Sequence, residues 1–429
     1  MNICIIGVGY VGLVTAACFS SLGHTVIGIE SDIDKLKKLK KGFSTIYEPG
    51  IDKLIKEGLR KKKLFFFSDI EKGVEKCEVI FICVGTPPKD DGEPDLSHVE
   101  KVVRKIASSL RGYRLIVEKS TVPVNTWQWV KRTISLYNKH NSEFDVAVNP
   151  EFLREGNAVK DFLHPDRIVM GVENERSRDT LLKLYEKIKC PKLVTGLPTA
   201  EIIKHASNSF LATKISFINS VARLCEKVGA DVNEVAQGMG YDKRIGKSFL
   251  KAGVGYGGFC FPKDLAAFIH MAEKNGCDLG ILREVQKVNE SQKKLLISKI
   301  KDALWVLKGK TVGILGLSFK PDTDDMRLAP SIDVINLLQK EGAAIKAYDP
   351  QAMSNAGKVL KNVKFCKDPY LTAKDSDCLV FLTEWKEFEL LDMNRIRKVL
   401  KTPAIVDGRN IFDPEKMRKL GFVYGGMGR

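Results

Sequence analysis

The chain has 429 residues, of which 44% are hydrophobic and 28% charged, and its formal net charge is +16. This size and composition predict a soluble protein with about two or three domains, each with its own core. No stretch approaches the roughly 18 consecutive apolar residues of a membrane span. The N-terminus lacks a basic region and a cleavage site and runs directly into a glycine motif, so we expect no signal peptide.

Cysteines, histidines and lysines set further limits. The 10 cysteines form no CxxC pair, and Cys4, Cys18, Cys83 and Cys225 lie on apolar segments, where we expect small buried core residues. Free thiols in a large chain favour the reducing cytoplasm. The 6 histidines show no metal-ligand spacing, so we expect no metal. Lysine clusters at 35–41 and 60–63 would attract phosphate-bearing ligands or nucleic acid. No aromatic residues interleave with them, so we interpret most of these lysines as solvated helix faces and expect no nucleic-acid partner.

Residues 2–35 predict a strand, a tight glycine turn, a helix and a second strand. The apolar run 4–7 precedes a helix over 11–22 that ends at Gly23, and the second strand covers 25–29. Further buried strands are predicted at 79–84, 115–117, 144–148 and 167–171, with helical patterns between them. This alternation is typical of a mostly parallel, doubly wound α/β sheet.

Residues 199–228 predict one long helix, because apolar residues recur there at a spacing of three to four without a breaker. Thr199 is the expected N-cap and Gly229 the expected stop. Residues 310–350 then repeat the opening plan, with strands at 311–317 and 345–348 around a helix at 331–340. More strands are predicted at 380–383 and 404–406. We therefore expect two Rossmann-like domains, 1–198 and 306–429, joined by a central helical domain, 199–305. The second Rossmann-like domain lacks the full glycine fingerprint and is expected to hold a different ligand.

The run Gly7-Val8-Gly9-Tyr10-Val11-Gly12 fits the pattern GxGxxG. In a dinucleotide site the first glycine permits the tight turn, the second lets the pyrophosphate approach, and the third packs helix on strand. The phosphate would then meet the positive end of the helix. Glu30 ends the second strand, where a carboxylate accepts the ribose hydroxyls and repels a 2′-phosphate. This context favours NAD over NADP as the cofactor. It also favours a dinucleotide site over a glycine turn with only a structural role.

A second cluster surrounds Cys260. Glycine-rich residues 253–258 precede this cysteine, and Pro262 lies in the first turn of the helix that follows. A thiol at a helix N-terminus beside Lys263 is expected to have a lowered pKa and to be nucleophilic. Asp264 is well placed for proton handling. A buried cysteine is the commoner fate of this residue type, and the expected mobility of the glycine loop argues against it.

Lys204 and Asn208 lie four residues apart on the long helix and therefore share one face. A lysine and an amide aimed at one oxygen would form an oxyanion site. Spacing alone favours a solvated polar pair.

Four more stretches complete a recognisable set: Val84-Gly85-Thr86-Pro87-Pro88, residues 118–123 (EKSTVP), residues 149–156 (NPEFLREG) and residues 316–325 (GLSFKPDTDD). Together with the three clusters, and in this order, they resemble the UDP-glucose/GDP-mannose dehydrogenase family over nearly the whole chain. That family's three-domain plan agrees with the organisation predicted above. The stretches 151–156 and 164–167 resemble the UDP-glucose enzymes of the family more than the UDP-N-acetylmannosamine ones.

The resemblance implies an NAD site, a nucleotide-sugar site and a homo-oligomer. NAD is expected to contact Gly7, Val8, Gly9, Tyr10, Val11, Gly12, Glu30, Lys35, Val84, Gly85, Thr86, Pro87, Pro88, Ser120, Thr121, Val122, Glu155, Lys263 and Arg327. The nucleotide sugar is expected to contact Glu151, Phe152, Leu153, Arg154, Glu155, Lys204, Asn208, Arg244, Phe249, Leu250, Lys251, Ala252, Gly253, Tyr256, Gly257, Phe319, Lys320 and Arg409. In the family, the residue matching Arg244 reaches a neighbouring subunit's site, which implies at least a dimer.

The implied reaction is a four-electron oxidation of UDP-glucose at C6 to UDP-glucuronate, with NAD accepting the hydrides. Water held by Thr121 and Asp264 would take the hydroxyl proton, and Cys260 would add to the aldehyde. Lys204 and Asn208 would stabilise the oxyanion, and Glu151 would assist hydrolysis of the thioester. The alternatives are the same chemistry on GDP-mannose or a UDP-N-acetylhexosamine, a homologue that binds nucleotide sugars without catalysis, and a nucleic-acid binder suggested by charge alone.

Four positions depart from the usual family pattern. Phe259 replaces serine beside the nucleophile, Glu30 replaces aspartate, Asn125 replaces glycine, and Leu328 replaces glutamate.

Overall fold

The structure is a computed structural model that describes residues 1–87, 89 and 93–429. It divides into two compact units, each described here by itself. The first comprises residues 1–207 and 266–275, and the second comprises residues 208–265 and 276–429. The boundaries fall within helices α9 (Leu197–Val228) and α11 (Cys260–Lys274). The three-domain division expected from the sequence stays a prediction.

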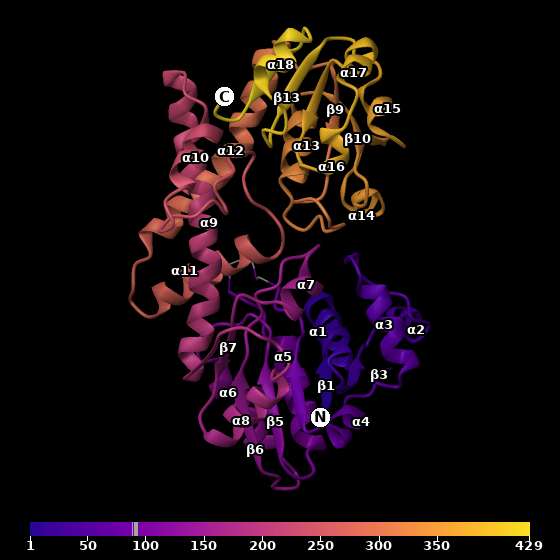
Figure 1. Cartoon of the computed structure of the whole chain (residues 1–429), viewed down its shortest axis with the longest axis vertical. Helices are drawn as coiled ribbons and strands as arrows, with labels where there is room; N and C mark the ends of the chain where they lie inside the picture. The colour runs from indigo at the N-terminus through magenta and orange to yellow at the C-terminus, as the bar shows by residue number, and fades with distance from the viewer. Residues whose placement is uncertain (88, 90–92) are drawn as a thin grey trace. The chain divides into compact units, whose positions relative to one another are not determined.

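An eight-stranded sheet forms the centre of the first unit (Figure 1). Its strands run in the order β3-β2-β1-β4-β5-β6-β7-β8, and every neighbouring pair is parallel except β6 and β7. The bounds are β1 (Asn2–Ile6), β2 (Thr25–Ile29), β3 (Leu64–Phe67), β4 (Val79–Ile82), β5 (Arg114–Glu118), β6 (Phe144–Val148), β7 (Ile168–Gly171) and β8 (Lys192–Thr195). The predicted doubly wound sheet is confirmed, and β3 and β8 are additions that the hydrophobic pattern did not reveal.

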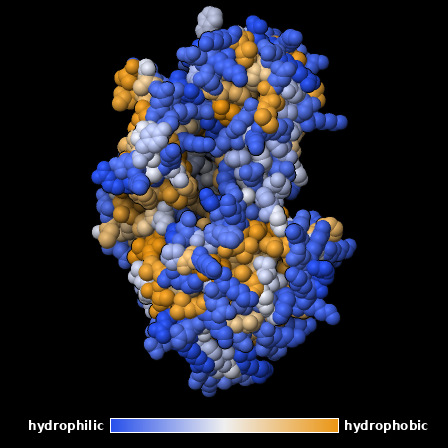
Figure 2. Space-filling view, viewed as in Figure 1, coloured by the Kyte–Doolittle hydropathy of each residue, from blue (hydrophilic) through white to orange (hydrophobic). Residues whose placement is uncertain are grey.

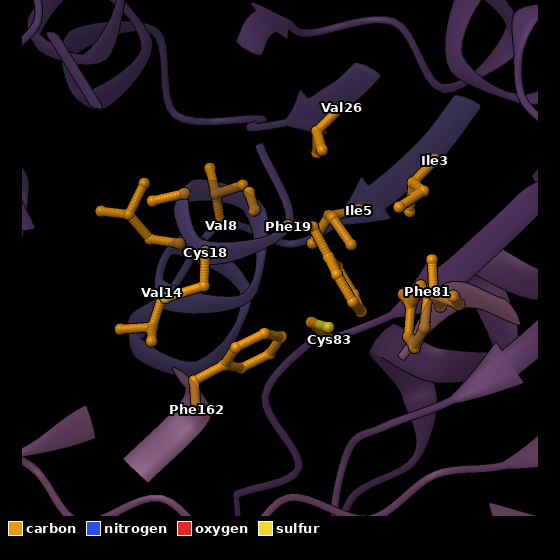
Figure 3. Packing of buried hydrophobic residues seen from close by; sticks show 14 of the residues in the cluster. Ile3, Ile5, Val8, Val14, Cys18, Phe19, Val26, Phe81, Cys83 and Phe162 are labelled. Atoms are coloured by element: carbon orange, nitrogen blue, oxygen red, sulfur yellow. The ribbon is translucent and has the colours of Figure 1, made fainter. Parts of the chain in front are cut away.

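Helices cover both faces of this sheet because successive strand residues point to opposite sides. Ile3 and Ile5 of β1 pack with α1 residues in one core, whereas Cys4 and Ile6 belong to a second core that includes residues of α5 and α6. Figure 3 shows the first core, where Phe19 of α1 lies near Phe81 of β4. The helices are α1 (Tyr10–Ser21), α2 (Ile33–Lys40), α3 (Ile51–Arg60), α4 (Ile70–Lys76), α5 (Ser97–Ser109), α6 (Thr126–Tyr137), α7 (Ala158–Leu163) and α8 (Glu175–Leu184).

The second unit contains a six-stranded, wholly parallel sheet in the order β11-β10-β9-β12-β13-β14. This order repeats that of the first six strands of the other sheet, so the expected second Rossmann-like fold is confirmed. Its strands are β9 (Thr311–Leu315), β10 (Ala344–Tyr348), β11 (Val363–Phe365), β12 (Cys378–Phe381), β13 (Ala404–Asp407) and β14 (Val423–Gly426). Its helices are α10 (Val232–Gly240), α12 (Gly280–Leu304), α13 (Pro330–Lys340), α14 (Met353–Val359), α15 (Pro369–Ala373), α16 (Lys386–Glu389), α17 (Met393–Val399) and α18 (Pro414–Lys419).

Helix α9 confirms the predicted long helix, although it begins at Leu197 and so places the expected cap Thr199 inside its first turn. Gly229 follows its end with φ of 75°, as a helix stop requires. The apolar stripe of the sequence faces outward: Phe210 is 65% exposed and Leu224 is 60% exposed. The side chains that α9 buries are mainly small or polar, among them Glu201, Lys204, His205, Asn208, Ser209, Ser216 and Asn219.

Cys4, Cys18, Cys83 and Cys225 are buried, as expected of core residues. Within the described ranges, no helix is long and apolar enough to cross a membrane.

Candidate active site

The glycine turn after β1 has the shape that a dinucleotide pyrophosphate needs. Gly7 has φ of 90°, in the left-handed region that favours glycine. A Cβ at Gly12 would lie 1.9 Å from the Gly7 carbonyl oxygen, whereas a Cβ at Gly9 would meet no described atom within 4 Å. No side chain caps the N-terminus of α1. The turn therefore leaves open space at Gly9, where a phosphate can approach the helix N-terminus.

Glu30 and Lys35 stand where the sequence predicts the adenosine ribose. Glu30 follows β2, and its carboxylate accepts the Asp32 N–H at 2.9 Å, which fixes one oxygen and leaves the other for a ligand hydroxyl. Lys35 is exposed in the first turn of α2. The residues present fit a dinucleotide, and the carboxylate at Glu30 suits a free 2′-hydroxyl.

The loop after β5 carries Ser120, Thr121 and Val122 and is tied to the loop after β4. Ser120 Oγ donates to the Val84 carbonyl at 2.7 Å, and Thr86 Oγ1 donates to the Thr121 carbonyl at 2.9 Å. Thr121 itself is partly exposed. Of the neighbouring predicted contacts, Gly85 and Pro87 are exposed, and Pro88 lies outside the described residues.

Asn125 ends this loop with φ of 71°. Asparagine tolerates the left-handed conformation better than most residues with a side chain. The substitution of the usual family glycine by Asn125 is therefore accommodated by the backbone.

The segment after β6 brings Glu151 to Lys204. The two side chains form a buried ion pair, with Lys204 Nζ 2.9 Å from Glu151 Oε1, and they are only 4% and 6% exposed. Glu151 Oε2 accepts the Leu153 N–H at 2.6 Å. The solvated polar pair that spacing alone favoured is wrong for Lys204, because this lysine is buried.

A cavity of about 240 Å³ opens beside this segment. The Arg167 guanidinium lies 3.7 Å from the centre of the Phe152 ring and the Lys204 ammonium lies 5.4 Å from it. Arg154 pairs with Asp161, and Glu155 is partly buried. The cavity is lined by Lys119, Asn149, Pro150, Glu151, Phe152, Leu153, Arg154, Lys160, Asp161, Phe162, His164, Pro165, Asp166, Arg167, Ile168 and Tyr185.

In the second unit, Cys260 is the first residue of α11 and is partly exposed, so its thiol lies at a helix N-terminus. Pro262 occupies the first turn, as predicted. This placement stabilises a thiolate and presents it to a ligand.

Three polar side chains lie buried in the same unit close to this cysteine in sequence or in space. Lys263 Nζ is 2.7 Å from Asp264 Oδ1, and Asn208 Nδ2 donates to Asp264 Oδ2 at 2.6 Å. Asp264 is thus held by an ammonium on one oxygen and an amide on the other. The solvated polar pair is wrong for Asn208 too, because this amide is buried and engaged.

The glycine loop 253–258 is not the mobile segment that its composition suggested. Ala252 and all six residues of the loop are buried. A Cβ at Gly253 would lie 2.7 Å from the Gly408 carbonyl, and one at Gly258 would lie 2.7 Å from the Phe319 ring. The glycines allow close packing against the Gly408 backbone and the Phe319 ring, which fixes the position of Cys260.

Arg409 joins this loop to the carboxyl ends of the second sheet. Its guanidinium donates to the carbonyls of Leu382 at 2.8 Å, Gly255 at 3.1 Å and Phe319 at 3.2 Å. Leu250 and Tyr256 are buried nearby in the chain, while Phe249 and Lys320 are partly exposed and Lys251 is exposed.

Phe259 lies between two cations predicted to bind the cofactor. Its ring centre is 4.4 Å from the Arg327 guanidinium and 5.5 Å from the Lys263 ammonium. The aromatic substitution therefore adds cation–π contacts that a serine could not make. Leu328, which follows Arg327, is exposed.

Arg244 stands apart from these groups. It is exposed, with a side chain that is 89% accessible, and it forms an ion pair with its near neighbour Asp242. The arrangement leaves the guanidinium in reach of another molecule.

The second sheet also has an acidic residue, Asp349, directly after β10. Its carboxylate accepts hydrogen bonds from groups of the protein itself. Asp349 is buried and accepts from the backbone N–H groups of Leu317, Ser318, Gln351 and Ala352. It also accepts from the Ser318 hydroxyl and the Trp385 indole. With both oxygens occupied, Asp349 cannot serve a ribose as Glu30 can.

One buried group of the first unit escaped the sequence reasoning. Glu48 accepts hydrogen bonds from the Tyr10 hydroxyl and from the Gly156 N–H, the latter at 2.7 Å. Burial, reinforced by the bond to Glu48, raises the pKa of Tyr10 above its usual range. Glu48 therefore ties the glycine turn to the 151–156 segment. A single glutamate before Pro49 gave no periodic or spacing signal for this role.

Among the described residues, no three His, Cys, Asp or Glu side chains gather closely enough to hold a metal ion.

Comparisons with known proteins agree with this geometry. Three profiles of the UDP-glucose/GDP-mannose dehydrogenase family match the chain: the NAD binding domain over residues 1–189, the central domain over 198–291 and the UDP binding domain over 313–414. The match to the first profile confirms the expected cofactor, NAD.

Individual relatives match over the full chain. The UDP-glucose 6-dehydrogenase of Rhizobium meliloti (strain 1021) is 44% identical, with 100% of both chains covered. The UDP-glucose 6-dehydrogenase TuaD of Bacillus subtilis (strain 168) is 42% identical, covering 100% of this chain and 93% of TuaD. A solved UDP-glucose dehydrogenase from the hyperthermophilic archaeon Pyrobaculum islandicum has a TM-score of 0.94 at 38% identity, with 100% of this chain and 97% of that chain covered. The chain therefore belongs to the UDP-glucose/GDP-mannose dehydrogenase family.

Proposed function

We propose that this protein oxidises UDP-glucose at C6 to UDP-glucuronate with NAD. The observation that carries the proposal is the partly exposed Cys260 thiol at the start of α11, next to the buried Lys263–Asp264–Asn208 network. A nucleophilic thiol distinguishes a four-electron oxidation from a simple alcohol dehydrogenase, because it holds the aldehyde for the second oxidation. The relatives named UDP-glucose 6-dehydrogenase support the choice of substrate.

Each polar residue has a separate task in this proposal. NAD, when bound, supplies the acceptor for one hydride in each of the two oxidations. Asp264 and Thr121 hold the water that takes the C6 hydroxyl proton. The Cys260 thiolate adds to the aldehyde carbon to give a thiohemiacetal, whose oxidation leaves a thioester. Lys204 and Asn208 donate to the oxygen that carries developing negative charge. Water then cleaves the thioester, with Glu151 accepting its proton, and the thiol is regenerated.

The remaining predicted contacts divide by ligand. NAD would be held by Gly7 to Gly12, Glu30, Lys35, residues 84–88 and 120–122, Glu155, Lys263 and Arg327. The nucleotide sugar would be held by residues 151–155 and 249–257, with Arg244, Phe319, Lys320 and Arg409. Arg409 is the best supported of these, because three carbonyls fix its guanidinium at the carboxyl ends of the second sheet.

The test is NADH formation from a panel of nucleotide sugars. UDP-glucose should give the highest kcat/KM and two NADH for each sugar consumed. Release of one NADH with free aldehyde would contradict the role of Cys260. A higher kcat/KM on GDP-mannose or a UDP-N-acetylhexosamine would assign the same chemistry to that sugar. Binding of UDP-glucose without NADH formation would indicate a homologue that has lost catalysis.

We also propose that the protein works as a homo-oligomer, at least a dimer, built on the outward face of α9. Phe210, Phe217 and Leu224 are exposed and repeat every seven residues, so they form one line along the helix. Figure 2 shows hydrophobic side chains gathered along the flank that α9 forms. Exposed apolar lines of this kind are typical of subunit interfaces.

The oligomer proposal predicts that Phe217→Asp lowers the mass measured by light scattering. If Arg244 completes a neighbour's site, the same change should lower activity in parallel. Full activity in a monomeric variant would contradict the role of Arg244. Finally, we propose a cytoplasmic location, since the 10 cysteines of the sequence include no CxxC pair and no regular disulfide framework.

A further inference from the structure

Two buried carboxyl groups lie beneath the loop that carries Thr121, and nothing in the proposed reaction uses them. Glu118 is the last residue of β5 and Glu201 lies in the second turn of α9. They are 1% and 3% exposed. Both Glu118 oxygens and the Glu201 Oε1 atom have no hydrogen-bond partner among the described residues. Buried polar groups without partners are rare and indicate a specific role.

Glu201 contacts the end of the Thr121 loop directly. Its Oε2 atom accepts the backbone N–H of Asn125 at 2.7 Å. Asn125 is the N-cap position of α6 and provides no side-chain cap of its own. A carboxylate at this place satisfies a terminal N–H group and complements the positive end of the helix dipole. Glu201 therefore caps α6 from a different helix.

A second residue of α9 holds the same loop. His205 Nε2 donates to the Val122 carbonyl at 2.8 Å, and its ring stacks on Phe268 of α11 at 5.7 Å. Glu201 and His205 are one turn apart on α9. Lys204, which directly precedes His205, pairs with Glu151. The first turns of α9 thus hold both the Thr121 loop and the 151–153 segment.

The charge on Glu201 depends on its surroundings. Burial raises the pKa of Glu201 to about 7, although the N–H groups of Asn125, Trp127 and Thr126 act to lower it. Burial, with the charge of Glu201 added, raises the pKa of Glu118 well above its usual range. Glu118 from β5 and His205 from α9 contribute titratable side chains at this place, while α6 contributes backbone N–H groups and α11 contributes the Phe268 ring.

We propose that Glu201 is a positioning residue whose ionised carboxylate holds the 121–125 turn, and with it Thr121, in the working conformation. Glu118 is the neutral partner, kept uncharged so that a single negative charge lies beneath the turn. Lowering the pH protonates Glu201 and weakens the cap, which loosens the Thr121 loop. The catalytic role of Thr121 rests on the proposed function. The effect of Glu201 on the conformation of the 121–125 turn does not.

The test compares Glu201→Gln with Glu118→Gln and Asn125→Gly. Glu201→Gln keeps the size and an acceptor oxygen but removes the charge. We expect kcat at about pH 8 to fall on the order of tenfold, as for a lost helix cap, with little change in either KM. The wild-type loss of kcat on the acid side, centred near the pKa of Glu201, should disappear in this variant. Glu118→Gln should keep the wild-type pH profile because that carboxyl is already neutral. Asn125→Gly should do so because it keeps the N–H donor and suits φ of 71°.

Hydrogen exchange gives a readout that needs no activity. The amides of 125–127 should exchange faster in Glu201→Gln, and faster in the wild type at about pH 6 than at about pH 8 after correction for intrinsic rates. Unchanged exchange in both comparisons overturns the proposal, as does an acid limb that persists in Glu201→Gln. A wild type that oxidises no nucleotide sugar would refute the proposed function and leave the exchange result standing. If Glu201→Gln does not fold, the pH dependence of exchange in the wild type still decides the matter.

Discussion

The buried ion pair between Lys204 and Glu151 allows stability and catalysis to be separated. Replacing Lys204 by methionine keeps the length of the side chain but removes the ammonium from the Glu151 carboxylate, which is 6% exposed and still accepts the Leu153 N–H. Breaking one side of a buried pair typically costs about 3–5 kcal/mol of unfolding free energy, because the other charge stays buried without compensation. We expect Lys204→Met to lose stability in that range.

The double variant Lys204→Met with Glu151→Gln removes both charges. Its unfolding free energy should return to within about 1 kcal/mol of the wild type, since replacing a whole buried pair is often neutral. Activity should not return, because loss of one oxyanion donor costs about 100- to 1,000-fold in kcat. Urea unfolding and NADH formation measure the two effects. A loss of less than about 1 kcal/mol in Lys204→Met would refute the reasoning, because it would show that Glu151 carries no buried charge.

Four further predictions concern the glycine turn, Glu30 and the nucleophile. Gly12→Ala should destabilise the protein by about 3 kcal/mol or more, because its Cβ would lie 1.9 Å from the Gly7 carbonyl. Gly9→Ala, which meets no described atom within 4 Å, should fold normally and weaken NAD binding in calorimetry; unchanged affinity would contradict the phosphate position. NAD should have a higher kcat/KM than NADP, and Glu30→Gln should narrow the gap; equal values in the wild type would show that Glu30 does not face the ribose. Cys260→Ser should nearly abolish turnover while mass spectrometry detects sugar trapped on the enzyme, and turnover near the wild-type rate would exclude Cys260 as the nucleophile.

Sequence periodicity predicted the elements whose burial pattern is regular. β1, α1 and β2 were predicted closely because the strands are buried and the glycine motif has a fixed place between them. β3 and β8 were not predicted, because each is short and only partly buried. The second Rossmann-like fold followed from the repeated strand–helix–strand pattern after residue 310, although β11 and β14 were not predicted.

The errors concern what covers a residue, which a pattern alone does not contain. The apolar stripe of α9 was visible in the sequence, but its outward direction was not, because the helix buries Lys204, Asn208 and other polar groups instead. Glycine composition was interpreted as mobility around Cys260, yet residues 253–258 are packed against Gly408 and Phe319. Mobile loops and tightly packed loops both require glycine, so composition does not distinguish them.

Roles that depend on long-range partners were also missed. Glu48, Glu118 and Glu201 are isolated acidic residues in the sequence. Their importance comes from the Gly156 and Asn125 N–H groups that the fold brings to two of them, and from the burial of the third without a partner.

The hydrogen bonds around Asp349 have a consequence for redesign of the second sheet. A designer who restored a GxGxxG turn after β9 would still find the acidic residue of that fold tied to six donors. Freeing it would leave the Leu317 and Ser318 amides and the Trp385 indole without an acceptor in the interior, a loss that compounds with each donor. The two sheets share a six-strand order but differ at this position: Glu30 accepts the Asp32 N–H on one oxygen, whereas both oxygens of Asp349 are bound by groups of the protein itself. Substitutions at Glu30 could therefore change the choice of cofactor, whereas Asp349 could not provide a second ribose-binding carboxylate.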